Sequence, residues 1–286
     1  MKLINKRAII TGASQGFGLA VAESFVREGC SVVLCARNAP ELKHAADTLR
    51  AKAPPGVRVE PTVCDVASAT SVADLFNFAV VMFGGLDIAV SNAGIYGPKG
   101  PTETIAPDDF QAAVQVNLMG TLYVCQEALR IFKPQKHGKI ILLSGGGATK
   151  PMPNIASYAA TKAAVVRLGE TLAEEVRDLG IDINSIAPGA LNTRLLAEVL
   201  AAGPDKVGKA FYDASIKQRQ TGGAPLENGA ELCVYLASDA SNGVTGKLIS
   251  AVWDPWPNLK QKLAQWNHGE IYTLRRIVPE DRGAKP

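Results

Sequence analysis

The sequence has no long apolar segment. None of its uninterrupted apolar runs approaches the roughly 18 residues that a membrane-spanning helix requires. The first residues also leave no room for a signal peptide, because Met1 and Lys2 lead within a few positions into the strand-like run 7–10. We therefore expect a cytoplasmic protein with no membrane partner.

A strong excess of charge of one sign is missing as well. The formal net charge is +3, and no long run of basic residues occurs. Proteins that bind nucleic acids usually carry such a basic cluster. No nucleic-acid partner is expected.

Cysteine is scarce and follows no pattern. The five cysteines are odd in number, widely spaced and include no CxxC pair. Disulfide frameworks and zinc sites need closely patterned cysteines, so we predict neither a disulfide nor a metal site. We interpret all five as buried, reduced thiols: Cys30, Cys35, Cys64, Cys125 and Cys233.

The sequence does contain a regular alternation of short apolar runs and longer amphipathic stretches. Of the 286 residues, 47% are hydrophobic and 20% are charged, which is typical of a chain that folds on its own. Strands that alternate with helices form parallel sheets covered on both faces. We predict an α/β fold, a single domain with a doubly wound, seven-stranded parallel sheet and helices on both faces. The expected strands are 7–11, 31–36, 57–63, 86–91, 139–143, 181–186 and 246–251.

Two regions depart from this alternation. Residues 191–225 form an irregular insertion after the sixth strand, which we interpret as a substrate lid. Residues 253–286 follow the last strand, with a short helix predicted at 258–266. We therefore divide the chain into a domain at 1–252 and a C-terminal extension at 253–286.

A glycine-rich turn follows the first predicted strand and precedes an amphipathic helical pattern. Glycine lets the backbone approach a pyrophosphate closely, and a helix N-terminus presents free N–H groups and the positive end of its dipole. An ordinary tight turn would use the same glycines, but the order strand, turn, helix favours a dinucleotide site. The residues expected at the cofactor are Gly12, Ser14, Gln15, Gly16, Phe17 and Gly18.

The end of the second strand predicts which dinucleotide binds. Sites for NAD usually have an acidic residue here, which accepts hydrogen bonds from the adenosine ribose. This sequence has Ala36 and then Arg37, whose guanidinium suits a 2′-phosphate and would meet no competing carboxylate. We expect NADP(H) rather than NAD(H). The alternative is that Arg37 is a solvated surface residue.

Tyr158 and Lys162 are four positions apart in a helical pattern, which puts both on one face. A free phenol has a pKa of about 10, and a nearby ammonium group stabilises the phenolate. Lys162 and a positively charged nicotinamide would together make Tyr158 a usable acid and base. In isolation, a packed tyrosine and a solvated lysine are the more ordinary interpretation.

Further motifs occur in a fixed order along the chain. The full set is Thr11-Gly12-xxx-Gly16-x-Gly18, Asp65, Asn92-Ala93-Gly94, Asn117, Ser144, Tyr158-xxx-Lys162 and Pro188-Gly189. In this order it resembles the short-chain dehydrogenase/reductase family, over about residues 5–251. The resemblance implies a Rossmann fold and hydride transfer between a nicotinamide cofactor and a carbonyl or alcohol group.

The resemblance also implies the roles of the catalytic residues. Ser144 would bind the substrate oxygen, Tyr158 would donate its proton during reduction, and Lys162 would lower the pKa of Tyr158 and bind the ribose. Asn117 would distort its helix and hold a water that relays protons from Lys162.

For the cofactor, the resemblance implies three further contacts. Asp65-Val66 would contact adenine, and Asn92-Ala93-Gly94 would lie beneath the cofactor. Pro188-Gly189 and Thr193 would position the nicotinamide carboxamide. Each motif alone is compatible with an ordinary turn or surface residue, so the ordered set is what favours the family.

Three features depart from the family pattern, and the mildest is Ser91, where the family usually has a second asparagine. Ser144 lies 14 residues before Tyr158, whereas the family serine more often lies 13 before, where this chain has Gly145. We assign the serine role to Ser144, on the expectation that the glycine-rich run after it absorbs a one-residue insertion. The family's common Asp-Gly-Gly ending is replaced by a tail that begins Ala251-Val-Trp-Asp-Pro-Trp256.

Two interpretations of the tail stand side by side. Its tryptophans and Arg275-Arg276 would fold over the substrate pocket of this subunit or a neighbour and select an acidic or phosphate-bearing substrate. Alternatively, the tail packs at an oligomer interface. The resemblance implies a homodimer or homotetramer formed through the helices at 107–132 and 155–179.

Several substrates fit this chemistry, among them a 3-oxoacyl thioester, a sugar-type ketone, a steroid-like ketone and a small aliphatic alcohol. A catalytically weak, NADP-binding regulatory or scaffolding protein would use the same fold. The retained pair of Tyr158 and Lys162 favours the enzyme.

Overall fold

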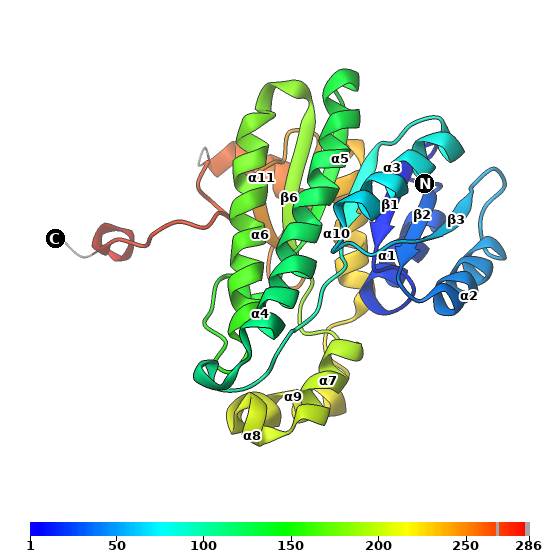
Figure 1. Ribbon diagram of the computed structural model, residues 1–286. Helices are drawn as coiled ribbons and strands as arrows, with labels where there is room; N and C mark the ends of the chain where they lie inside the picture. The colour runs from blue at the N-terminus through cyan, green and yellow to red at the C-terminus, as the bar shows by residue number, and fades with distance from the viewer. Residues whose placement is uncertain (267–268, 284–286) are drawn as a thin grey trace.

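Seven parallel strands form one sheet at the centre of the molecule (Figure 1). The computed structural model describes residues 1–266 and 269–283. The strands are β1 (Arg7–Thr11), β2 (Ser31–Ala36), β3 (Val59–Val63), β4 (Ile88–Ser91), β5 (Gly138–Leu143), β6 (Ile181–Ala187) and β7 (Lys247–Ser250). Their order across the sheet is β3-β2-β1-β4-β5-β6-β7. The predicted doubly wound, seven-stranded parallel sheet is therefore confirmed.

Helices cover both faces of this sheet and enclose two apolar layers (Figure 1). They are α1 (Gly16–Arg27), α2 (Ala39–Arg50), α3 (Ala69–Phe83), α5 (Gly120–Gln135), α6 (Ala156–Glu175) and α10 (Leu226–Ala237). Phe25 of α1 and Leu236 of α10 lie in one layer, and Phe76 of α3 and Phe132 of α5 lie in the other. The central strands β4, β5 and β6 are buried along almost their whole length because both of their sides are covered.

Short polar residues in the sequence set several helix ends. The side chain of Asn38 accepts a hydrogen bond from the N–H of Glu41 at the start of α2. Ser68 caps α3 in the same way through the N–H of Ser71. Each cap satisfies one of the N–H groups that a helix start leaves free. At its other end α3 stops at Gly84, whose φ of 73° is a left-handed conformation that favours glycine.

The two long helices predicted from the sequence are interrupted. The one expected at 107–132 consists of α4 (Pro107–Val114), one π-helical turn (Gln115–Met119) and α5. The one expected at 155–179 is α6 followed by a 3-10 turn (Arg177–Leu179).

The insertion at 191–225 is more regular than the sequence pattern indicated. Instead of irregular structure, it contains α7 (Arg194–Ala202), α8 (Pro204–Val207) and α9 (Lys209–Thr221). The helices are separated by Gly203 and Gly208, whose positive φ values of 78° and 84° break them. Buried Val199 and Val207 give this lid its own apolar contacts.

The tail after β7 packs along the edge of the sheet and then leaves the body. The helix predicted at 258–266 is present as α11 (Leu259–Trp266). The N–H of Leu248 donates to the carbonyl of Tyr272 at 2.7 Å, and the carboxylate of Glu170 accepts from the N–H of Leu274 at 2.6 Å. Beyond this point the chain projects away from the rest of the molecule (Figure 1).

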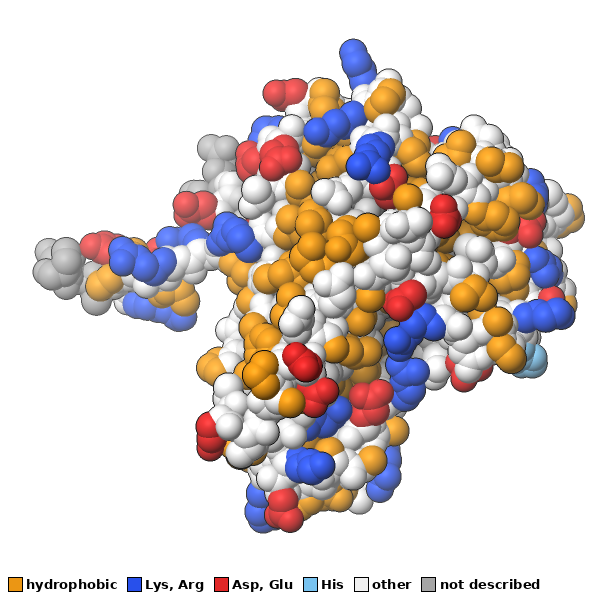
Figure 2. Space-filling view, viewed as in Figure 1, with side chains coloured by type: hydrophobic (Ala, Val, Ile, Leu, Met, Phe, Trp, Pro, Cys, Tyr) orange, Lys and Arg blue, Asp and Glu red, His pale blue; other side chains and the backbone are white. Residues whose placement is uncertain are grey.

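The predicted burial of the cysteines is confirmed. All five cysteines are buried and free. No helix among the described residues is long and apolar enough to cross a membrane. Figure 2 shows apolar side chains gathered over α5 and α6. The homo-oligomer implied by the resemblance stays a prediction.

Candidate active site

A cavity of about 790 Å³ opens at the carboxyl ends of the strands. It lies where the strand order reverses between β1 and β4, the place where doubly wound sheets bind ligands. Every predicted cofactor residue lines it: Gly12, Ser14, Gln15, Gly16, Phe17, Gly18, Arg37, Asp65, Val66, Asn92, Ala93, Gly94, Tyr158, Lys162, Pro188, Gly189 and Thr193. Ser144 lines it too, whereas Asn117 does not.

The glycine turn and the end of β4 interlock at the floor of the cavity. The side-chain amide of Asn92 donates to the carbonyl of Thr11 at 2.8 Å and to that of Gly12 at 3.1 Å. A Cβ atom added at Gly18 would lie 2.4 Å from the Asn92 amide nitrogen. Gly12 and Gly16 both have positive φ, and α1 begins at Gly16. A side chain at position 12 or 18 would clash with the chain around Asn92, so the N-terminus of α1 starts at a turn that requires glycine.

Beside the ends of β2 and β3, the cavity is lined by positively and by negatively charged side chains. Arg37 follows β2 and is exposed, and Asp65 follows β3. Glu41, in the first turn of α2, also lines the cavity and accepts a hydrogen bond from the Gln15 amide at 3.2 Å. Glu41 is thus a carboxylate of the same cavity that the expectation for Arg37 did not take into account. The sequence pattern did not mark Glu41, because it lies beyond the strand end where the acid is normally sought.

Tyr158 and Lys162 lie one turn apart near the start of α6, and both line the cavity. The Lys162 ammonium is 5.6 Å from the centre of the Tyr158 ring and donates to the carbonyl of Leu143 at 2.6 Å. Burial lowers the pKa of Lys162 to about 8. Burial, and then the neighbouring Tyr96, raise the pKa of Tyr158 well above its usual value. The predicted lowering of the Tyr158 pKa involves Lys162 together with a bound nicotinamide and stays a prediction.

Asn117 lies in the π-helical turn between α4 and α5, so the predicted distortion of its helix is present. Its side chain accepts from the N–H of Ile95 at 2.9 Å and donates to the Ile95 carbonyl at 2.9 Å and to the Thr161 hydroxyl at 3.0 Å. A Cβ atom added at Gly94 would lie 3.2 Å from the Asn117 amide oxygen and 3.5 Å from the Lys162 nitrogen. Asn117 thus ties the chain after β4 to the catalytic helix.

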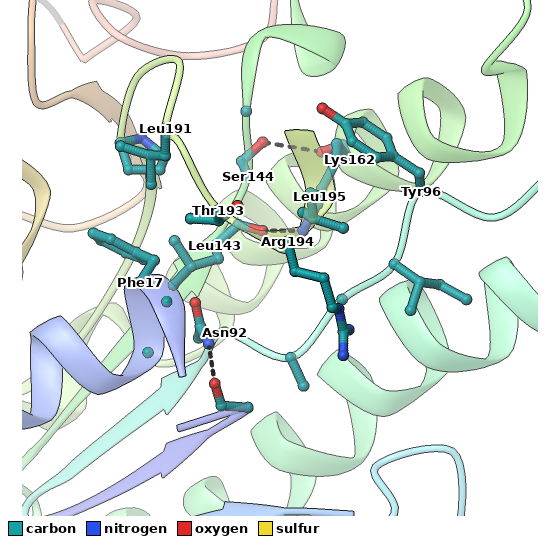
Figure 3. A pocket seen from close by; sticks show the side chains of 18 of the residues that line it. Phe17, Asn92, Tyr96, Leu143, Ser144, Lys162, Leu191, Thr193, Arg194 and Leu195 are labelled. Carbon is teal, nitrogen blue, oxygen red and sulfur yellow. Dashed lines mark hydrogen bonds between the residues drawn. The ribbon is translucent and has the colours of Figure 1, made fainter. Parts of the chain in front are cut away.

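Ser144 directly follows β5, and the main chain of α6 engages its hydroxyl. The hydroxyl donates to the main-chain oxygen of Lys162 at 3.3 Å (Figure 3), and the residue is only 4% exposed. A Cβ atom added at Gly145 would instead lie 3.1 Å from the Tyr158 hydroxyl. Position 145 therefore faces Tyr158, and the assignment of the serine role to Ser144 stays a prediction.

One side of the cavity is formed by the loop after β6, the insertion at 191–225 and the start of the tail. Leu191, Leu195 and Phe211 line it with Met152 from the loop before α6. Trp253, from the tail, also lines it and is 85% exposed. Trp253 is one of the tail tryptophans expected at the pocket. The other four side chains were not identified from the sequence, because their positions depend on how distant segments pack.

Arg275 and Arg276 do not reach the cavity of their own subunit. Arg275 pairs with Glu270 at 3.3 Å and also with Asp281. Neither arginine lines the cavity. Within one subunit, the expected contact of these arginines with the pocket is therefore wrong. Among the residues that the structure describes, no group of His, Cys, Asp and Glu is arranged to hold a metal ion.

Comparisons with known proteins agree with this arrangement. A sequence model of the short chain dehydrogenase family matches residues 6–203. The chain is 39% identical over 248 residues to 3beta-hydroxysteroid dehydrogenase 1 of Eggerthella lenta, covering 86% of this chain and 92% of that protein.

Two solved structures show the same likeness. A gluconate 5-dehydrogenase from Burkholderia cenocepacia, in complex with NADP and tartrate, is similar with a TM-score of 0.76 and 30% identity, over 87% of this chain and 94% of that one. An NAD⁺-bound xylitol dehydrogenase is similar with a TM-score of 0.78 and 26% identity, over 87% and 98%.

Proposed function

The chain belongs to the short-chain dehydrogenase family, and on that premise we propose that it is an NADP(H)-dependent oxidoreductase that interconverts a carbonyl group and a secondary alcohol. One observation carries the proposal. The glycine turn at one end of the cavity and the pair of Tyr158 and Lys162 at the other line the same space. A dinucleotide that spans this space brings its reactive ring to the only proton donor and base that the family chemistry needs.

The residues present fit a dinucleotide. The cradle formed by Gly12, Gly18 and Asn92 leaves no room for a side chain, and the N-terminus of α1 offers free N–H groups to a pyrophosphate. Arg37 would hold a 2′-phosphate, which supports NADP(H). The hydrogen bond from Gln15 to Glu41 supports this choice, since it engages the nearby carboxylate. When bound, the cofactor supplies the hydride.

The protein's own residues handle the proton. The raised pKa of Tyr158 keeps its hydroxyl protonated near neutral pH, which suits a proton donor in carbonyl reduction. Lys162 would bind the ribose and bring positive charge to Tyr158 when the phenolate forms. Asn117 would act as a positioning residue, because its side chain ties Ile95 to Thr161 one residue before Lys162.

The lining of the substrate side supports a bulky apolar substrate. Met152, Leu195, Phe211 and Trp253 offer mainly apolar surface there. The likeness to a 3beta-hydroxysteroid dehydrogenase points the same way. We propose a hydroxyl or keto group on a fused or substituted ring, such as a steroid, as the substrate class.

The test is turnover of NADP⁺ by the purified protein, followed as NADPH absorbance, with a panel of 3β-hydroxysteroids, sugar alcohols and small aliphatic secondary alcohols. The proposal predicts turnover with the ring alcohols in the wild type and none in Tyr158→Phe. Tight NADP⁺ binding without turnover of any panel member would contradict it and would favour the regulatory or scaffolding alternative.

A further inference from the structure

The position beside the Tyr158 hydroxyl carries no side-chain hydroxyl from β5 or the loop that follows it. Gly145 stands there, and a Cβ atom added to it would lie 3.1 Å from the Tyr158 hydroxyl. The adjacent hydroxyl, that of Ser144, donates to the carbonyl of Lys162. In this arrangement neither residue 144 nor residue 145 offers an unengaged hydroxyl to a substrate oxygen at Tyr158.

Tyr96 lies on another side of the same space. Its ring centre is 4.6 Å from that of Tyr158, with the two ring planes tilted by 55°, and both residues line the cavity. Among the described residues, neither phenolic hydroxyl has a hydrogen-bond partner, although the hydroxyls of Tyr123 and Tyr235 both do. Two phenol rings whose hydroxyls are unengaged thus lie against each other on the cavity wall.

The backbone around Tyr96 is held in place. The Ser157 hydroxyl donates to the Tyr96 carbonyl at 3.3 Å, and Asn117 binds both main-chain groups of Ile95. The Lys99 ammonium lies 5.7 Å from the centre of the Tyr96 ring. These contacts join Tyr96 to α6, the helix that carries Tyr158. A preorganised donor of this kind needs little rearrangement during the reaction.

We propose that Tyr96 takes the place of the family serine and donates the second hydrogen bond to the substrate oxygen. The inference rests on the proposed function. In reduction, the carbonyl carbon accepts the hydride from the cofactor, and the electron pair of the C=O π bond moves to the oxygen. The oxygen then takes the proton of Tyr158, which is left as phenolate. Tyr96 keeps its own proton throughout and only stabilises the charge on that oxygen.

Burial raises the pKa of Tyr96, which agrees with a hydroxyl that stays protonated. Glu198 adds to this rise. Its carboxylate, on α7, also pairs with Lys99 at 3.5 Å and with Arg194 at 3.4 Å. The charged groups around Tyr96 therefore come from both the loop after β4 and the lid.

The first experiment compares Tyr96→Phe with Tyr212→Phe in the oxidation of epiandrosterone, a 3β-hydroxysteroid, by NADP⁺. Tyr212 lies on α9 and lines a separate lid cavity, so it is a matched loss of a hydroxyl outside the site. Tyr96→Phe is expected to lower kcat about 100-fold with an unchanged Kd for NADPH, because one donor to the reacting oxygen is lost. Tyr212→Phe is expected to stay within about twofold of the wild type.

A rescue separates this role from a structural one. Gly145 has a φ of 170°, extended backbone that serine adopts, so Gly145→Ser would place a hydroxyl beside Tyr158. In the Tyr96→Phe background it is expected to restore kcat at least about tenfold. An unrestored double variant, a Tyr96→Phe loss below about threefold, or a loss of about 100-fold in Ser144→Ala would overturn the proposal.

A second measurement holds even if epiandrosterone is not a substrate, an outcome that counts against the proposed substrate class alone. Crystals of the complex with NADP⁺ are soaked in cyclohexanol. The alcohol oxygen is expected within hydrogen-bond distance of the hydroxyls of both Tyr96 and Tyr158. An oxygen bound by the Ser144 hydroxyl instead would refute the role of Tyr96 independently of turnover.

Discussion

The two halves of the cavity are built in opposite ways. In the cofactor half, a Cβ atom at Gly12 or Gly18 would lie only 2.9 Å or 2.4 Å from the chain around Asn92. In the substrate half, a Cβ atom at Gly146 would meet nothing within 4 Å, and Trp253 is 85% exposed. The half expected to bind a ligand common to the family is closely interlocked. The half expected to bind the particular substrate is open and departs from the family pattern.

The largest expected effect is on kcat, from a substitution at Tyr158 that should leave cofactor binding nearly unchanged. Tyr158→Phe removes the proton donor and should lower kcat about 1000-fold, within the range of general acid catalysis. The Kd for NADPH, measured by calorimetry, should stay within about threefold of the wild-type value, because the phenol is not a phosphate contact. A parallel loss of cofactor binding would show that the halves are not separable.

Arg37→Ala tests the cofactor half from its far end. Loss of a charge-assisted contact to the 2′-phosphate should raise the Kd for NADPH about 10- to 100-fold. The Kd for NADH should hardly change, since NADH lacks that phosphate. Equal effects on both cofactors would mean that Arg37 acts on the fold rather than on the phosphate.

A matched pair of glycine substitutions tests the difference in packing. Gly18→Ala should lower the free energy of unfolding by about 1–3 kcal/mol, because its methyl group overlaps the Asn92 amide. Gly146→Ala should change it by less than about 0.5 kcal/mol, because the methyl group has open space. Urea unfolding of both variants measures this contrast. Equal losses of unfolding free energy would show that the two positions do not differ in packing.

Lys162 is expected to lower the stability of the folded chain although the proposed reaction needs it. Its pKa of about 8 in the folded chain lies below the unfolded value of about 10.4. The unfolded state therefore binds more protons between these two values, and the stability of the wild type should rise as pH increases from about 8 to about 10.

Lys162→Met should remove this pH dependence. At pH 7 the variant should be more stable by about 1–2 kcal/mol, less than the pKa shift alone implies because the hydrogen bond to Leu143 is also lost. Thermal unfolding at the two ends of the pH window is the measurement. A variant less stable than the wild type at pH 7 would contradict the claim that the buried Lys162 ammonium destabilises the folded chain.

The sequence predicts the two halves unequally, for a physical reason. The cofactor half follows from local patterns, since a strand end, a glycine and a helix start are neighbours in the chain, and Gly12, Gly16 and Gly18 all lie where expected. The sheet is predicted for the same reason, from its apolar strands.

What the sequence does not predict depends on contacts between distant segments. Tyr96 meets Tyr158 across 62 positions, and Glu41 reaches the cavity only through the packing of α2. The choice between Ser144 and Gly145 turns on which side of the chain faces Tyr158 at the end of β5. A shift of one residue reverses that side, and spacing alone does not determine it.

The cofactor assignment is tested by calorimetric titration of the wild-type protein with NADPH and with NADH, side by side. NADPH is expected to bind at least about tenfold more tightly than NADH, because it gains one charge-assisted phosphate contact. Equal or tighter binding of NADH would contradict the role given to Arg37. Absence of binding by either cofactor would contradict the oxidoreductase itself.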